Sequence, residues 1–354
     1  MSKGQTSEIK DVGRKISFFE KFLPVWIILC MALGIFLSQI IPGIGVTIDS
    51  WQIRGISIPI GICLFLMMYP AMLNLQASEL RKLGKNPKPI ILTLVSNWII
   101  APIIGVTMAI LFLRDVQLIF AIILLSSSPC TAMVLVWGWM AKGNQEQNVI
   151  TTSVNTATII LLYIPVVTLL VFIANITLEK KIPLDPVILL ISLFVFIGLP
   201  LLLGIVSKKV LISAKGEDWF DRKYRPAVSK IAIGALLMTL VVLFSLNGNI
   251  LIQRPDLLLL ITIPLLLGFA IVVSINIIIS KLAKLNYREA IITIIIGSSS
   301  HFEIAIAVAV AMYGVGSIAA LGTTMGLFWE VPIMLSLVYL GIFLNKKGFW
   351  ESEK

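Results

Sequence analysis

Most of this chain consists of apolar runs of about 20 residues, the length at which a helix can cross the hydrocarbon core of a membrane. Short polar segments join these runs. Of the 354 residues, 58% are apolar and only 13% are charged, whereas soluble domains carry about a quarter of charged residues. The sequence therefore predicts an all-α integral membrane protein and excludes a soluble globular domain.

The apolar runs predict ten transmembrane helices. Their expected bounds are 25–42, 56–74, 89–112, 118–140, 149–174, 186–206, 228–246, 257–280, 290–312 and 317–344, and Gly248 is expected just after the seventh. With the N-terminus inside, 23 of the 28 Lys and Arg residues fall on the cytoplasmic side and five outside. Basic residues prefer the cytoplasmic side of membrane proteins, so both termini are predicted to be cytoplasmic. The net charge of +10 then indicates contact with the membrane surface and not with nucleic acid.

Polar residues interrupt two of the runs. The first break (residues 126–131) contains three serines followed by Pro129, Cys130 and Thr131, and the second break (residues 298–301) contains three serines followed by His301. Proline lacks a backbone donor, so Pro129 leaves the carbonyl of Leu125 without its helical partner. Within a membrane such a break persists only where it is buried in protein or lines a cavity.

The second half of the chain repeats the first. The two serine triplets are 172 residues apart, and the same spacing separates Thr151-Thr152 from Thr323-Thr324. Five helices in each half would give the second half the opposite orientation, and inverted repeats with broken helices are typical of transporters whose site lies where the breaks meet. We therefore predict a cytoplasmic segment 1–24, a first repeat 25–174, an inverted second repeat 175–344, a cytoplasmic tail 345–354, and crossing broken helices 4 and 9.

Two carboxyl groups and one histidine lie within the predicted spans. Glu303 follows the second break, and Glu330 lies in the tenth span beside Pro332. A buried carboxyl group can hold a proton because burial disfavours its charged form, which suits a proton-coupled carrier. The alternative for each is a structural hydrogen bond to freed carbonyls or hydroxyls. His301, the only histidine, is a candidate proton relay or, as is more common at a helix break, a structural donor.

Cys130 is the most distinctive residue of the first break. It is predicted to start the resumed helix, whose positive end favours a thiolate, and soft sulfur selects thiophilic solutes. Trp137 lies seven residues on and is predicted to share the helical face of Cys130. The repeat aligns Thr131 with Glu303, which indicates a small thiophilic substrate handled beside protonatable groups.

Further polar residues are candidates to complete the site. Asn97 and Asn155 belong to the helices that flank the first break, where each can line the site or bond a neighbouring helix. Ser128, Ser299 and Ser300 belong to the serine triplets at the two breaks. The three cysteines show neither disulfide nor paired metal-site spacing, and no cofactor is predicted.

The motif Pro129-Cys130-Thr131-Ala132-Met133-Val134, with Trp137 after it, resembles the signature of the arsenical-resistance permeases. These form the arsenite branch of the bile acid/arsenite transporter superfamily. The distal Glu330-Val331-Pro332 strengthens the resemblance, which runs from about Phe18 to Leu344.

The resemblance implies ten helices in two inverted repeats, located in the plasma membrane, that export arsenite and sometimes antimonite against proton entry. It implies that Cys130 binds the metalloid and that Glu330 carries the proton. The recurrent family positions fall on Asn97, Trp137, Asn155 and Glu303. The oligomeric state is left open.

The sequence departs from the family around the site. The second break reads Ser299-Ser300-His301 where the family usually has an asparagine, Thr156 stands where aspartate is common, and serines replace small alanines before Pro129. These changes concern substrate range and coupling more than fold.

Two alternatives to arsenite export differ from it in the chemical groups that they need. A sodium-coupled organic-anion symporter of the same superfamily would need carboxylate and amide oxygens for sodium, and the breaks offer few amides. An intramembrane serine hydrolase would pair a serine of residues 126–128 with His301 as base, but the sequence has no recognisable nucleophile loop.

Overall fold

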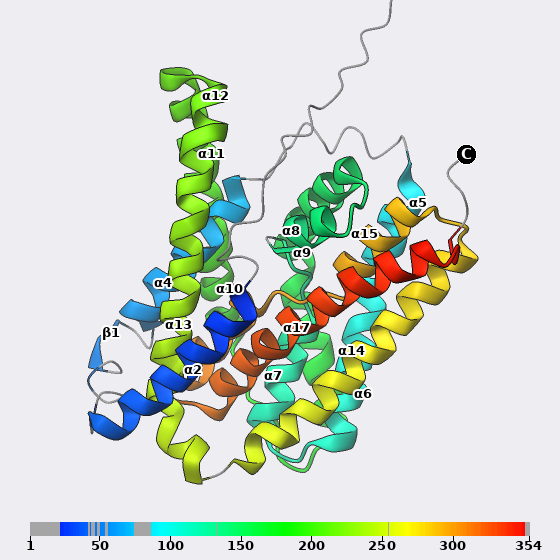
Figure 1. Cartoon of the computed structure of the whole chain (residues 1–354). Coiled ribbons are helices and arrows are strands. Elements are labelled where there is room, and N and C mark those ends of the chain that lie inside the picture. Colours follow the sequence, from blue (N-terminus) through cyan, green and yellow to red (C-terminus); the bar gives the residue numbers. More distant parts are fainter. Residues whose placement is uncertain are drawn as a thin grey trace, which may run out of the picture.

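The computed structural model of the protein describes residues 22–41, 43, 47, 50–53, 56–73, 86–131, 133–253 and 255–350. Most of the predicted cytoplasmic segment 1–24 lies outside these residues. The described chain is helical apart from two short antiparallel strands, β1 (Gln52–Ile53) and β2 (Ile56–Ser57). Figure 1 shows the arrangement.

Two helices of the first half run into one another without a loop, because a π-helical turn, η2, joins them. In chain order the elements are α2 (Leu23–Ile40), α4 (Ile58–Leu73), α5 (Pro87–Val95), η2 (Ser96–Ile100), α6 (Ala101–Phe112), α7 (Val116–Ser126), α8 (Met133–Met140) and α9 (Gln145–Thr177).

The second half has π-helical turns η3 and η4 within its first two long helical runs. The elements are α10 (Pro186–Leu193), η3 (Phe194–Gly198), α11 (Leu199–Lys215), α12 (Glu217–Trp219), η4 (Phe220–Tyr224), α13 (Arg225–Gln253), α14 (Asp256–Leu282), α15 (Tyr287–Gly297), α16 (Phe302–Tyr313) and α17 (Ile318–Lys346).

Among the described residues, seven helical runs are long and apolar enough to cross a membrane. Three shorter apolar helices, Val25–Ile40, Ile58–Pro70 and Val116–Ser126, add to them. The run Tyr287–Tyr313 differs from the others because its most apolar 18-residue window is entirely buried, whereas 33–39% is buried in the other six. The second break lies inside this run, so protein and not lipid surrounds it.

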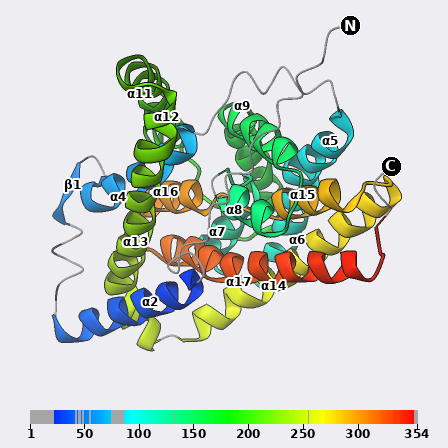
Figure 2. The ribbon, with the colours of Figure 1, turned by 45° about the horizontal axis from the view of Figure 1, so that its top comes forward.

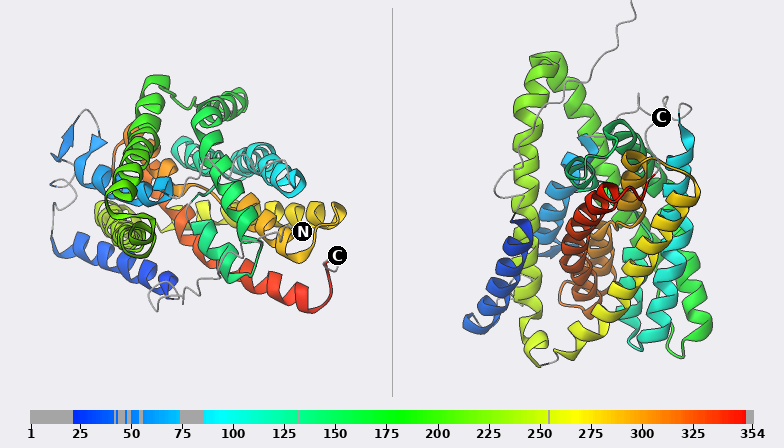
Figure 3. Two further views of the ribbon diagram at one scale, coloured as in Figure 1. Left: turned by 90° about the horizontal axis from the view of Figure 1, so that it is seen from above. Right: turned by 45° about the vertical axis from the view of Figure 1, so that its right-hand side comes forward.

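The helices form two packed groups (Figure 3). In one group α13 packs along α2 and α4, and α4 also packs against α11. A methyl group on Gly34 of α2 would lie 2.7 Å from the Val241 carbonyl oxygen, and one on Gly248 of α13 would lie 2.0 Å from Ser38 Oγ. The expectation that Gly248 follows a helix end is therefore wrong. It lies inside α13, where its missing side chain lets α2 approach.

The other group contains both breaks. In it α17 packs against α7 and α16, α6 packs against α7 and α14, and α15 packs against α5 and α14. Helices α7, α15 and α16 consist mostly of buried residues. The polar breaks therefore lie in a deeply buried part of the protein.

Candidate functional site

Serine hydroxyls complete the end of the helix before the first break. The last carbonyls of a helix have no partner within it, and here the hydroxyls of Ser126 and Ser127 both donate to the Ile123 carbonyl, at 3.2 and 2.5 Å. Ser128 is also buried, but its hydroxyl has no hydrogen-bond partner among the described residues. Ser126 and Ser127 thus cap α7, whereas the hydroxyl of Ser128 is not bonded by any described residue.

The second break is held by neighbouring helices. Ser96 of η2 donates to the Gly297 carbonyl at 2.7 Å, and Asn276 of α14 donates to the Ser298 hydroxyl at 2.9 Å. The Ser299 hydroxyl donates to the Ile296 carbonyl at 2.9 Å. Together these bonds satisfy the end of α15 without any continuation of the helix.

The two breaks are in direct contact. The His301 backbone N–H donates to the Ser128 carbonyl at 2.9 Å, which joins the two interruptions. Helix α7 packs against α16, and α8 packs against α15 (Figure 2). The half-helix before each break therefore lies beside the half-helix after the other.

Glu330 of α17 is bound to the second break. The Ser300 backbone N–H donates to Glu330 Oε1 at 3.1 Å, and the Ser300 hydroxyl bonds Glu330 Oε2. The side chain is buried, with 4% of its surface exposed. One residue of the break thus engages both oxygens of a buried carboxyl group.

His301 connects the first break to Glu303. Its Nε2 lies 3.2 Å from the Thr131 hydroxyl, and its Nδ1 lies 2.9 Å from Glu303 Oε2, close but not aligned as a hydrogen bond. All three side chains are buried. Among the described residues, His301, Glu303 and Glu330 are the buried members of the set Asp, Glu, His, Lys and Arg.

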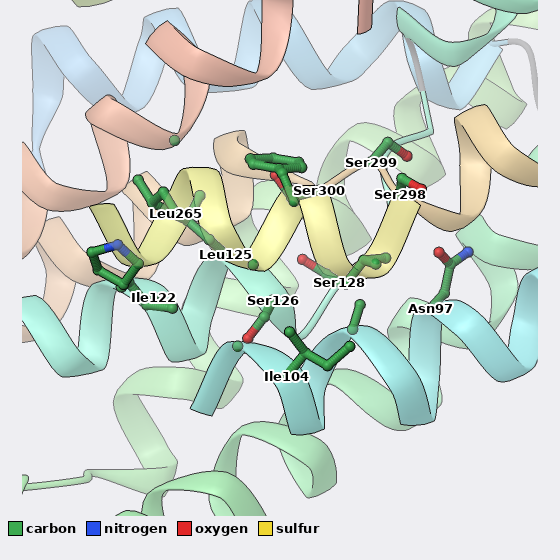
Figure 4. Close-up of a pocket in the computed structure, with 17 residues that line it drawn as sticks. Asn97, Ile104, Ile122, Leu125, Ser126, Ser128, Leu265, Ser298, Ser299 and Ser300 are labelled. Atoms are coloured by element: carbon green, nitrogen blue, oxygen red, sulfur yellow. The ribbon is translucent and has the colours of Figure 1, made fainter. Parts of the chain in front are cut away.

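A cavity of about 60 Å³ lies between the breaks, η2, α6, α14 and α17 (Figure 4). One water needs about 10–15 Å³ measured in this way, so the cavity has room for about four waters. Its polar lining comes from both breaks and from η2: Asn97, Ser126, Ser128, Ser298, Ser299 and Ser300. The polar groups gather where the breaks meet, and the rest of the wall is apolar.

The cavity brings together four of the predicted site residues: Asn97, Ser128, Ser299 and Ser300. Glu330 adjoins it through Ser300, and Thr131 and Glu303 belong to the His301 contacts. Cys130 is buried in the first break, two residues after Ser128. It is not among the residues that line the cavity.

Two predicted residues lie away from the cavity lining. Asn155 of α9 is fully buried, and neither amide atom has a hydrogen-bond partner among the described residues. Trp137 is buried in α8. The expectation that Trp137 shares a helical face with Cys130 is wrong, because α8 begins at Met133 and Cys130 lies in the break before it.

The apolar wall of the cavity is not predicted by the sequence. Helix α14 contributes Pro264, Leu265, Gly268, Phe269 and Val272. None of these residues has a polar side chain, and all of them are typical of transmembrane helices. The available hint was Pro264, which lies within a helix, where a proline frees a carbonyl.

We predict that replacing Asn97 lowers transport without lowering the stability of the fold. Its amide is 98% buried and lines the cavity, with no partner for either polar atom among the described residues. A buried unsatisfied polar group costs about 1–3 kcal/mol, so Asn97→Leu should unfold at the same temperature as the wild type or higher. Solute transport should nevertheless fall. Thermal unfolding and uptake measured on one preparation test this, and Thr107→Val, an exposed change on α6, is the control. A variant with lower stability and normal transport would contradict the cavity assignment.

Comparison with known proteins is consistent with these features. Residues 61–254 match the Sodium Bile acid symporter family. The chain is 38% identical to an uncharacterized transporter of Synechocystis sp., with 96% of this chain and 91% of that protein covered. It is 32% identical to the arsenical-resistance protein Acr3 of Alkaliphilus metalliredigens, with 96% of each chain covered. It is 31% identical to Acr3 of Corynebacterium glutamicum, with 95% and 92% covered.

The family and these relatives are transporters, which excludes the serine hydrolase. The contacts of His301 agree with this exclusion, because its Nε2 faces Thr131 and not a serine of the triplets. The apolar helices and the family together make this a multi-pass membrane protein that carries a small solute. The chain belongs to the Sodium Bile acid symporter family and, within it, to the arsenical-resistance permeases.

Proposed function

We propose that this protein exports trivalent arsenite, and also antimonite, across the plasma membrane in exchange for protons. Cys130 binds the metalloid, with Thr131, Asn97, Trp137, Asn155, Ser128, Ser299, Ser300 and Glu303 as its surroundings. Glu330 carries the proton, with Glu303 as a second protonatable group. Both termini are cytoplasmic.

One observation carries the proposal: Ser300 lines the cavity and also binds both oxygens of Glu330. The Ser300 hydroxyl can donate to an ionised Glu330 or to a hydroxyl of the cargo, but not to both at once. The carboxyl group of Glu330 can likewise hold either a proton or a hydroxyl of the cargo, so that proton and cargo compete for one site. Alternating access to such a site exchanges cargo for protons.

The size and chemistry of the cavity suit arsenite. Trivalent arsenite is present near neutral pH as As(OH)₃, a small uncharged hydroxide of four heavy atoms. Room for about four waters matches that size. Six hydroxyl and amide side chains around the cavity can bond its hydroxyls, and a thiol two residues from Ser128 supplies the soft ligand.

The repeat supports alternating access. Helices α7 and α15 each contain 11 residues and begin after a capping side chain, Asp115 and Asn286. Helices α9 and α17, which follow the broken pairs, likewise begin after Asn144 and Ser317. These caps are 171 and 173 residues apart, close to the 172 that separates the serine triplets. We propose the inverted repeats 25–174 and 175–344 on this basis.

Transport into everted vesicles tests the function. In vesicles from a bacterial host without its own arsenite exporters, an acidic interior should drive arsenite uptake, and a protonophore should stop it. Arsenite uptake that ignores the proton gradient would overturn the coupling. Uptake of an organic anion driven by a sodium gradient, with no arsenite transport, would establish the symporter alternative.

A further inference from the structure

His301 contacts both breaks and an acidic side chain at once. Its backbone N–H bonds the Ser128 carbonyl at 2.9 Å, its Nε2 lies 3.2 Å from Thr131 Oγ1, and its Nδ1 lies 2.9 Å from Glu303 Oε2. Only 1% of the residue is exposed. A single side chain thus links the two halves of the site from a fully buried position.

The contacts of His301 can accommodate either protonation state of its ring. In the neutral ring, Nδ1–H faces Glu303 and Nε2 accepts from the Thr131 hydroxyl. When Nε2 gains a proton it becomes a donor, and the Thr131 hydroxyl rotates to accept, because a hydroxyl can do both. The imidazole can therefore take up or release a proton without losing either neighbour.

The charges around His301 favour the protonated form of its ring. An ionised Glu303 beside a neutral His301 leaves an uncompensated buried charge, which is costly. Among the described residues no Lys or Arg is buried to offset it. The titratable side chains on the elements packed against α16 are Glu330 and the exposed Tyr339 and Lys346 on α17, and Cys63 and Tyr69 on α4. Helices α7 and α10 carry no acidic or basic residue. Imidazolium is thus the available buried counter-charge for Glu303.

We propose that the His301–Glu303 pair is a second proton-binding site, distinct from Glu330, so that two protons enter for each arsenite exported. The inference rests on the proposed function. Each half-site would deliver one proton: Glu330 through the Ser300 contact, and His301 through the Thr131 contact that joins the breaks.

The ratio of protons to arsenite tests the proposal. In proteoliposomes at equilibrium, each coupled proton multiplies the arsenite gradient by about tenfold per unit of pH gradient. The wild type should therefore reach about 100-fold per pH unit, and His301→Gln about tenfold. Glu303→Gln and the double variant should match His301→Gln, because the pair binds one proton between its two members.

The outcomes separate the two proposals. A wild type with no dependence on the pH gradient would overturn the proposed function, and this inference with it. A coupled wild type whose slope is unchanged in His301→Gln would overturn the second proton site alone. His301→Asn provides the same comparison if His301→Gln does not fold.

A direct measurement uses the fact that the chain has one histidine. In protein labelled with ¹⁵N-histidine and purified without a histidine tag, all imidazole signals arise from His301. Adding arsenite at fixed pH should convert the signal from the imidazolium pattern to the neutral pattern. An imidazole that keeps one protonation state with and without arsenite would overturn the proposal.

Discussion

Glu330→Gln should lower proton-driven arsenite uptake by about 100-fold or more, because a positioned proton-transfer group typically contributes about 10²–10⁴-fold. Glutamine keeps the hydrogen bonds at this position. Its carbonyl oxygen can accept from the Ser300 N–H, and its amide can donate to the Ser300 hydroxyl. The fold and the cavity are therefore retained while the proton is lost.

The expected defect in Glu330→Gln is one of coupling. Exchange of labelled for unlabelled arsenite across the membrane, which needs no net proton movement, should persist in the variant. Glu217→Gln is the matched control, since Glu217 is exposed at the start of α12, away from the breaks. Full proton-driven uptake by Glu330→Gln would contradict the assignment of the proton to this residue.

Cys130→Ser should raise the arsenite concentration for half-maximal transport by at least about 10–100-fold, the loss typical even for outer-shell partners of a bound metal. Serine has nearly the same shape as cysteine but a hard oxygen, which binds the thiophilic metalloid far less well. Because Cys130 is 99% buried in the first break, the change removes a ligand and leaves the surface as it was. Antimonite transport should fall in parallel.

Two matched controls for Cys130→Ser are present in the same chain. Cys30 in α2 and Cys63 in α4 are half-buried within unbroken helices. Cys30→Ser and Cys63→Ser should transport arsenite with near wild-type affinity. Equal affinity in all three variants would show that the thiol of Cys130 is not the metalloid ligand.

The predicted breaks and the structure agree because breaks are local. Three consecutive serines that cap the last carbonyls decide within a few residues where α7 and α15 end, and Pro129 adds to this after α7. The polar character of the site follows for the same reason, since Asn97, Ser128, Ser299 and Ser300 stand out in an apolar sequence and also line the cavity. The prediction that Trp137 shares a helical face with Cys130 is wrong because α8 begins only at Met133.

What the sequence by itself determined is therefore a membrane-spanning helical chain, interrupted at two repeated positions by residues suited to a solute site. Only the tertiary structure decided which residues meet there. The contact between Thr131 and His301 joins positions 170 apart, the bond between Ser300 and Glu330 joins positions 30 apart, and α14 supplies an apolar wall with no sequence signal. The physical reason is that the length and polarity of a segment are set by residues that are neighbours in the chain. The partners of a buried side chain depend instead on how whole helices pack.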